Sequence, residues 1–317
     1  MGKILCIGEA LIDMICTDKG QTLAAGEQFL KKPGGAPTNV AAAIAALGGQ
    51  VALAAKVGND PFGTQLISVM KSFGVDTQLM IKDDTYFTTL AFVSLMHSGD
   101  RDFVFNRGAD GQLSIHDTAA IQVTDYNIIH FGSATGFLTG PLQLAYKDLF
   151  EKAINNKKFV CFDPNYRHLL FKHDRASFIL QSWHFLNNCS FFKLSDEEAL
   201  LLTNTTDISA ATDYLLQHTT ANFAITIGQA GTLLAYNKII YSIPSIPIVA
   251  TDTTGAGDAF VGALLYQLHQ YNLAEINELT LAQWLQFIAN ANKAGARTCE
   301  YVGAMEAYKH LTNQIFN

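Results

Sequence analysis

The chain has 317 residues, of which 49% are hydrophobic and 15% charged, and its formal net charge is −7. This length and apolar content suit a large folded core and exclude a disordered or fibrous protein. The acidic balance and the lack of any Lys/Arg cluster argue against nucleic acid as a partner, because binding successive phosphates requires concentrated cations. We therefore expect a small-molecule ligand.

The five cysteines are odd in number, widely separated and never arranged as a CxxC pair. This pattern predicts neither a disulfide framework nor a zinc site. Near the N-terminus, Glu9 and Asp13 interrupt the apolar run, which argues against a signal peptide and against a membrane-spanning helix there. We expect a protein of the reducing cytoplasm with no membrane association.

Apolar segments of the first half alternate between strand and helix character. Strands separated by helices at this spacing predict βαβ units around a parallel sheet. Ligands of such sheets bind outside the carboxyl ends of the strands. The predicted strands are residues 3–11, 50–58, 127–133 and 158–164, and the predicted helices are residues 37–49, 61–74 and 141–156.

Two segments break this alternation, residues 14–32 and residues 86–106. Both lack helical periodicity, and the second contains the turn HSGD between two apolar runs, which predicts short antiparallel strands. We expect these strands to form a small lid. Because no Pro/Gly/Ser-rich linker occurs, we predict a single domain over residues 1–317 with the lid inserted.

Three polar motifs lie where a ligand is expected. GGAPTN opens a helix, and its glycines allow close backbone approach while Asn39 either caps the helix or binds a hydroxyl. DPNYR follows an apolar strand and brings Asp163, Asn165 and Arg167, whose guanidinium suits phosphate oxygens. In KLSDEE, Lys193 ends a strand and Ser195 opens a helix with a capping box, so that only one carboxylate of its first turn need face a metal.

Two glycine-containing segments follow. Residues 224–236 predict either a simple hairpin or a turn that holds nucleotide phosphates. DTTGAGDAF, residues 252–260, precedes an apolar helix, and this is either ordinary helix-start chemistry or an anion site built from bare N–H groups. Asp258 would repel a bound phosphate, so its presence favours a role in accepting a proton from an attacking hydroxyl.

No Walker or dinucleotide fingerprint occurs in the sequence. Instead, DTTGAGDAF and GGAPTNVAAAIAALGGQVALAAKVGNDPFG resemble the two signature regions of the PfkB (ribokinase-like) carbohydrate kinases, and the similarity extends from IGEALID to ANKAGARTCEYVGA. The resemblance implies a ribokinase-like three-layer α/β/α fold with a central, mostly parallel sheet and a small β-sheet lid. It also implies an ATP-dependent sugar kinase that uses Mg²⁺ and is activated by K⁺.

The resemblance also assigns site residues. It implies that Asp258 is the general base, beside an anion hole of Gly255, Ala256 and Gly257, with Arg167 at the transferred phosphate. For the sugar the expected residues are Asp13, Gly34, Gly35, Asn39, Arg107 and Asn165, and for ATP they are Lys193, Thr226, Gly228, Gly231 and Asn292. Glu198 matches the acid of an Asn-x-x-Glu magnesium motif that acts through water, although Ser195 replaces the Asn, and Asp252 and Thr254 match a potassium loop.

Within the family, GEALID, GGAPTN and DPNYR are most similar to fructokinases, which implies that D-fructose is converted to fructose 6-phosphate. The main alternative is 2-keto-3-deoxygluconate kinase, since Arg101 and Arg107 in the lid could pair with a sugar carboxylate. Ribokinases and nucleoside kinases are less similar, and a sugar-binding regulator without activity is the non-enzymatic alternative. A homodimer formed through the lid is a further expectation.

Overall fold

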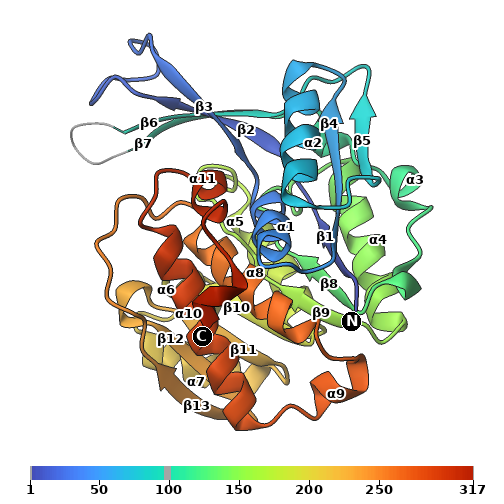
Figure 1. Cartoon of the computed structure of the whole chain (residues 1–317), viewed down its shortest axis with the longest axis vertical. Coiled ribbons are helices and arrows are strands. Elements are labelled where there is room, and N and C mark those ends of the chain that lie inside the picture. The colour runs from blue at the N-terminus through green and yellow to red at the C-terminus, as the bar shows by residue number, and fades with distance from the viewer. Residues whose placement is uncertain (1, 96–100, 317) are drawn as a thin grey trace.

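The computed structural model describes residues 2–95 and 101–316, except for the side chains of Leu95 and Arg101. In this described part, a large sheet lies between two layers of helices, and a smaller sheet projects from one end of it (Figure 1). This arrangement confirms the predicted α/β class, the three layers and the second sheet.

The large sheet has nine strands among the described residues, in the order β13-β12-β11-β10-β9-β8-β1-β4-β5. Strands from β5 to β11 pair in parallel, and β12 and β13 complete one edge in antiparallel pairs. Residues 224–236 form a hairpin, since β11 and β12 pair directly in antiparallel register. The strands are β1 (Ile4–Ile7), β4 (Val51–Gly58), β5 (Met80–Asp83), β8 (Ile128–Phe131), β9 (Phe159–Phe162), β10 (Phe191–Ser195), β11 (Asn222–Thr226), β12 (Thr232–Tyr236) and β13 (Ile239–Ile243).

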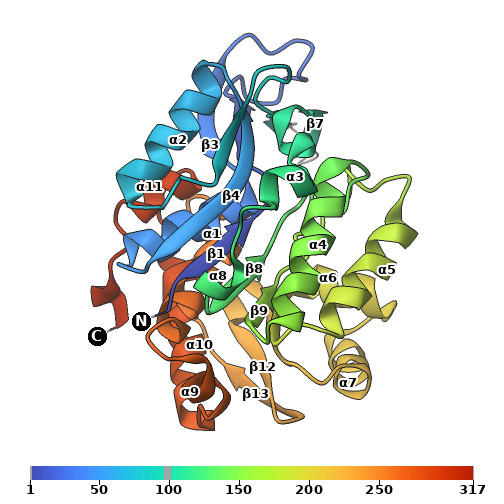
Figure 2. The same ribbon diagram turned by 90° about the vertical axis from the view of Figure 1, so that its right-hand side faces the viewer.

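Helices cover both faces of this sheet, as the turned view shows (Figure 2). Successive side chains of a strand point to opposite faces, so Ile4 and Cys6 of β1 join one buried core while Leu5 and Ile7 join the other. This double burial explains why the strands are continuous apolar runs. One face carries α1 (Ala36–Ala46), α2 (Pro61–Phe73), α8 (Ala256–Leu268), α9 (Leu273–Asn277), α10 (Leu281–Thr298) and α11 (Ala304–Tyr308), and the other carries α3 (Ile115–Thr118), α4 (Pro141–Asn155), α5 (Arg175–Leu186), α6 (Asp196–Thr203) and α7 (Ile208–His218).

The small sheet contains four strands in the described residues, β2 (Leu11–Cys16), β3 (Phe29–Gly34), β6 (Leu90–Leu95) and β7 (Arg101–Asn106), in the order β3-β2-β6-β7. β2 pairs with β3 and β6 pairs with β7 in antiparallel fashion. The parallel pair β2–β6 connects these two hairpins into one sheet. The predicted turn at residues 97–100 lies outside the described residues. Because β2 follows β1 and β3 leads into α1, the root of this sheet lies at the carboxyl edge of the large sheet.

Candidate active site

The predicted site residues converge where three features meet: the carboxyl edge of the large sheet, the start of α8 and the root of the small sheet. Asn39 of α1 and Asp258 of α8 are 219 positions apart, yet Asn39 Nδ2 donates to Asp258 Oδ2 at 2.8 Å. Close packing of the two helices permits this contact, because a Cβ added at Gly262 would lie 2.7 Å from Ala43 Cβ. Asn39 therefore does not cap its helix but orients a carboxylate.

Asp258 is buried, with 7% of its surface exposed. Burial raises the pKa of Asp258 to about 6, while the Asn39 hydrogen bond limits the rise. Arg167 and Lys193 also favour the ionised form, whereas Asp163 opposes it. A carboxylate with this pKa is ionised near neutral pH and is a competent proton acceptor.

The N-terminus of α8 is open. Gly255 has φ 80°, a left-handed conformation, and a side chain there would overlap Ala304. Among the described side chains none caps this helix, although the Ala256 N–H donates to the Thr253 carbonyl at 3.2 Å. Free N–H groups and the positive end of the helix dipole favour an anion at this position, next to Asp258.

Lys193 lies beside this helix start. Its Nζ is 3.2 Å from Asp163 Oδ2, and a Cβ added at Gly257 would also lie 3.2 Å from the same Nζ. Burial lowers the pKa of Lys193, but Asp163, Glu198 and Asp258 together raise it above the ordinary value, so the ammonium stays charged. Lys193 lies inside β10 rather than at its end as predicted, because the strand continues to Ser195, which pairs with Thr226.

Two buried oxygen atoms at this site have no hydrogen-bond partner within the described part of the chain, Asp163 Oδ1 and Asn39 Oδ1. Buried polar atoms are normally paired, so these two suit a metal ion or a ligand hydroxyl. No cluster of three or more His, Cys, Asp or Glu able to hold a metal occurs among residues 2–95 and 101–316.

Glu198 lies in the first turn of α6, where it forms the predicted capping box with Ser195. Its carboxylate accepts from the N–H groups of Tyr166 and Ser195, both at 2.8 Å. Burial raises the pKa of Glu198, and the nearby Lys193 partly offsets this rise. The Ser195 hydroxyl accepts from the Glu198 N–H at 3.1 Å, so it serves as the helix cap.

Asp13 lies within β2, opposite Lys32, whereas the sequence predicted a single strand over residues 3–11 that ended before it. A side chain at position 34 would overlap the Asp13 carboxylate, so only a glycine there leaves room for it. Burial raises the pKa of Asp13 to about 7, Arg167 lowers it and Glu9 raises it further. Arg167 thus acts electrostatically on both Asp13 and Asp258.

A sequence model described as "pfkB family carbohydrate kinase" matches residues 1–311. The chain belongs to the pfkB family of carbohydrate kinases. The Arabidopsis thaliana protein named "Probable fructokinase-3" is 34% identical over 311 residues, which cover 96% of this chain and 88% of that protein.

Solved structures of the family have the same fold. The Xylella fastidiosa fructokinase with bound ATP is 29% identical with a TM-score of 0.85, and the match covers 99% of this chain and 96% of that chain. A double mutant of the Vibrio cholerae O395 fructokinase, with fructose, ADP and potassium ion bound, is 27% identical with a TM-score of 0.84. That match covers 100% of this chain and 97% of the Vibrio chain. The predicted ribokinase-like fold is thereby confirmed.

In this pfkB kinase, four of the five residues predicted to contact ATP gather around the β11–β12 hairpin, while Lys193 lies on β10 beside Asp163 and the start of α8. Thr226 ends β11, and both Gly228 and Gly231 have positive φ, at 58° and 104°. The Asn292 side chain accepts from Thr232 at 2.6 Å and donates to the Ile243 carbonyl at 3.1 Å. Asn292 therefore fixes the backbone that leaves β13, and any contact with ATP must be made in addition to these bonds.

The predicted potassium loop is docked against the turn before α11. One oxygen of Asp252 accepts from the Thr254 N–H and hydroxyl at 2.9 and 2.7 Å, and the other accepts from the Gly303 N–H at 2.8 Å. The N–H groups of Thr251 and Asp252 both donate to the Cys299 carbonyl. Asp252 thus holds in place the loop that leads into the start of α8.

The remaining predicted sugar residues have contacts within the protein. Asn165, with φ 49°, donates to the Gly132 carbonyl at 3.0 Å and so joins the loops after β8 and β9. Arg107 lies 3.6 Å from Asp110 and donates to the carbonyls of Thr135 and Thr139. The Arg101 side chain lies outside the described residues. No helix in the described ranges 2–95 and 101–316 is both long and apolar enough to span a membrane.

Proposed function

We propose that this pfkB kinase is an ATP-dependent fructokinase that transfers the γ-phosphoryl group of ATP to D-fructose and forms fructose 6-phosphate. The observation that carries the proposal is the Asn39–Asp258 hydrogen bond at the open start of α8. Fructokinases among the relatives, including the fructose-bound Vibrio structure, support the choice of sugar.

In the proposed reaction, the sugar hydroxyl attacks the γ-phosphorus while its proton passes to the Asp258 carboxylate. The new bond joins the sugar oxygen to phosphorus, and the bond to the β-phosphate oxygen breaks to release ADP. The N–H groups of Gly255 and Gly257, together with Lys193 and Arg167, stabilise the charge on the transferred group. The Ala256 N–H joins them only by giving up its bond to the Thr253 carbonyl. Asp13, Gly34, Gly35 and Asn39 orient the sugar.

We further propose that the ATP is bound as its magnesium complex. The free oxygen of Asp163 and the carboxylate of Glu198, acting through water, suit Mg²⁺, which prefers a few carboxylates and substrate phosphates. The ion would neutralise charge on the phosphates. Asp252 and Thr254 are proposed to bind K⁺, and the potassium ion in the Vibrio structure supports this.

Arg107 bears on the choice between a neutral sugar and a sugar acid. Its Nε lies 3.6 Å from Asp110 Oδ2 without a hydrogen bond among the described residues, and its terminal nitrogens donate to the carbonyls of Thr139 and Thr135, so the guanidinium faces a carboxylate of the protein itself. This favours fructose over 2-keto-3-deoxygluconate, whose carboxylate would need an available cation.

The test is kcat/KM for fructose, 2-keto-3-deoxygluconate and ribose with ATP and Mg²⁺, on the wild type and on Arg107→Ala. We expect fructose to exceed the others by at least about tenfold. Arg107→Ala should lower all three values by a similar factor. A tenfold preference for the sugar acid that Arg107→Ala abolishes would overturn the assignment, and sugar binding without any phosphorylation would indicate a regulator.

We also propose that the chain acts as one domain, residues 1–317, in which the small sheet is a lid. Leu30 and Val104 are exposed on this sheet, which supports a homodimer through the lid. Sedimentation of the wild type and of Val104→Lys tests this, since the substitution should shift a dimer toward the monomer. A cytoplasmic location is proposed from the free thiols of its cysteines.

A further inference from the structure

Two buried carboxylates lie outside the reaction centre, Glu9 and Asp110, each only 1% exposed. The hydroxyl of Thr135 lies between them, 3.4 Å from Glu9 Oε2 and 3.0 Å from Asp110 Oδ2. Burial raises the pKa of Glu9, and Asp110 adds to the rise. A hydroxyl has one proton to donate, so Thr135 donates to only one of the two acids at a time, and Asp110 Oδ2 is the nearer acceptor. Glu9 Oε2 also accepts from the Ser133 hydroxyl, which lies 3.5 Å from that of Thr135, so the two hydroxyls link the two acids in one hydrogen-bonded unit.

The inner end of this unit holds the turn proposed to bind the sugar. Glu9 Oε1 accepts from the N–H of Ala36 at 3.0 Å and from the N–H of Ala134 at 3.2 Å. Ala36 is the first residue of α1, directly after Gly34 and Gly35. Any shift of the Glu9 carboxylate therefore moves this turn.

The outer end of the unit holds the root of the small sheet. Asp110 Oδ1 accepts from the Thr89 hydroxyl, which in turn accepts from the Gly108 N–H at 2.8 Å. Thr89 directly precedes β6, and Gly108 lies two residues after β7. The Thr89 carbonyl accepts from Ile12 of β2 at 3.0 Å, so three of the four strands are fixed near this point.

We propose that Glu9, Thr135 and Asp110 are positioning residues that couple the root of the small sheet to the Gly34–Gly35 turn, so that sugar binding and the placement of the lid depend on each other. This inference rests on the proposed sugar site. Hydrogen-bond networks can carry coupling of this kind between two parts of a protein. Removal of the Thr135 hydroxyl would interrupt this unit between Glu9 and Asp110.

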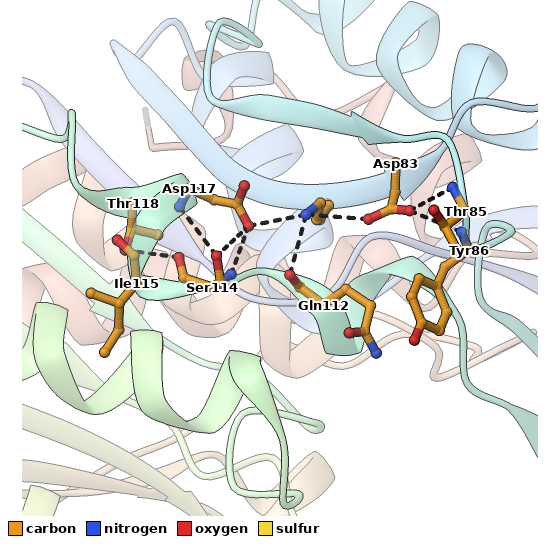
Figure 3. A network of polar contacts seen from close by, with 9 residues as sticks. Asp83, Thr85, Tyr86, Gln112, Ser114, Ile115, Asp117 and Thr118 are labelled. Atoms are coloured by element: carbon orange, nitrogen blue, oxygen red, sulfur yellow. Dashed lines mark hydrogen bonds and ion pairs between the residues drawn. The ribbon is translucent and has the colours of Figure 1, made fainter.

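A neighbouring network provides a matched control. Lys56 of β4 lies 3.2 Å from Asp83 and 3.0 Å from Asp117, and it donates to the Gln112 carbonyl at 3.3 Å (Figure 3). It anchors the same segment of chain, residues 109–118, to the large sheet. Within the part of the chain that the structure describes, Lys56 forms no hydrogen bond or ion pair with the sugar turn or with the strands of the small sheet.

The decisive variant is Thr135→Val, which removes the bridging hydroxyl at nearly constant volume. We expect the KM for fructose to rise about five- to tenfold, as loss of such hydrogen bonds implies, while the KM for ATP stays within about twofold. Thr135→Ser keeps the hydroxyl and should restore the wild-type KM. Asp117→Asn should lower the melting temperature and leave the fructose KM unchanged.

Hydrogen exchange of the Gly108 amide gives a readout independent of turnover. Fructose alone should slow this exchange in the wild type and in Asp117→Asn but not in Thr135→Val. Thr135→Val with normal fructose KM and normal protection would overturn the coupling, as would an equal rise of the fructose KM in Asp117→Asn. Should the wild type not phosphorylate fructose, the proposed function fails, and the exchange experiment with whichever panel sugar binds still decides the coupling.

Discussion

Lys56 and Lys193 are both paired with aspartate, but Lys56 is half-buried and Lys193 is buried; their side chains are 13% and 7% exposed. Lys56 contacts two carboxylates and a carbonyl, and both of its aspartates also accept backbone N–H groups (Figure 3). Lys193 has one close partner, Asp163, whose second oxygen is unpartnered within the described residues.

The difference separates a structural network from the proposed reaction centre. Around Lys56 the ammonium, the two carboxylates and the nearby backbone groups are hydrogen-bonded to one another, so this network serves to hold these chain segments together. Around Lys193, Asp163 Oδ1 and Asn39 Oδ1 have no hydrogen-bond partner within the described residues, and the N-terminus of α8 has no side-chain cap there. Burial at this site also raises the pKa of Asp258. Polar groups that lack hydrogen-bond partners and lie close together, beside a carboxyl group of shifted pKa, are typical of ligand-binding sites.

The largest expected effect is the loss of the base. Asp258→Asn should lower kcat by about 10²–10⁴-fold with little change in ATP affinity, because only the proton acceptor is removed. Initial rates and ATP titration measure both. Asp117→Asn makes the same chemical change in the Lys56 network and should keep kcat, and an Asp258→Asn enzyme with a tenth of normal turnover would remove Asp258 from this role.

Gly257→Val should cost about 10²-fold in turnover, since its side chain would displace Lys193 and misplace the N–H groups that face the transferred phosphate. Fructose affinity should be retained. Kinetics at saturating fructose and a direct binding measurement separate the two effects. Lost affinity with unchanged turnover at saturation would make this loop a sugar contact instead.

Acid should inactivate the enzyme in two steps. Burial raises the pKa of Asp13 to about 7 and that of Asp258 to about 6, and both roles require the ionised form. The kcat/KM for fructose should therefore fall about tenfold per pH unit between about 7 and 6 and more steeply below 6. Asp13→Asn should lower activity and remove the upper step. A profile that is flat from pH 5 to 8 would contradict both assignments.

Potassium should have the smallest effect. The ion proposed at Asp252 and Thr254 would add positive charge near the start of α8 without touching the substrates. Replacing a large organic cation with K⁺ should raise kcat several-fold, and Asp252→Ala should abolish the rise. Steady-state rates at constant ionic strength test this, and equal rates in the two salts would argue against a functional site.

Contiguous motifs made much of this site predictable from sequence. Residues 252–260 and 34–39 each contain the glycines and the acid or amide that their turns require, so local chemistry indicates their role. Residues 3–11 were predicted as one strand, but β1 ends at Ile7 and a second strand, which contains Asp13, begins at Leu11. The chain bends at Gly8, whose φ is 144°, and a single glycine does not by itself distinguish such a bend from the end of a strand.

The Glu9–Thr135–Asp110 unit could not be predicted. Thr135 and Glu9 are 126 positions apart, and their contact arises only when loops at the sheet edge pack together. Glu9 interrupts the predicted strand over residues 3–11, and only the structure shows that Glu9 and Asp110 are both buried.

The most direct test of the contrast between the two lysines is the turnover of folded Lys193→Met and Lys56→Met, with their unfolding free energies measured in parallel. Lys193→Met leaves the buried Asp163 without its lysine and should lose about 3 kcal/mol of stability. Lys56→Met leaves two half-buried aspartates that still accept backbone N–H groups, and it should lose less, about 1 kcal/mol. Lys193→Met should also lose at least about 10²-fold in kcat, because a charge that stabilises phosphoryl transfer is gone, whereas Lys56→Met should stay near wild type. Equal turnover in the two folded variants would contradict the account.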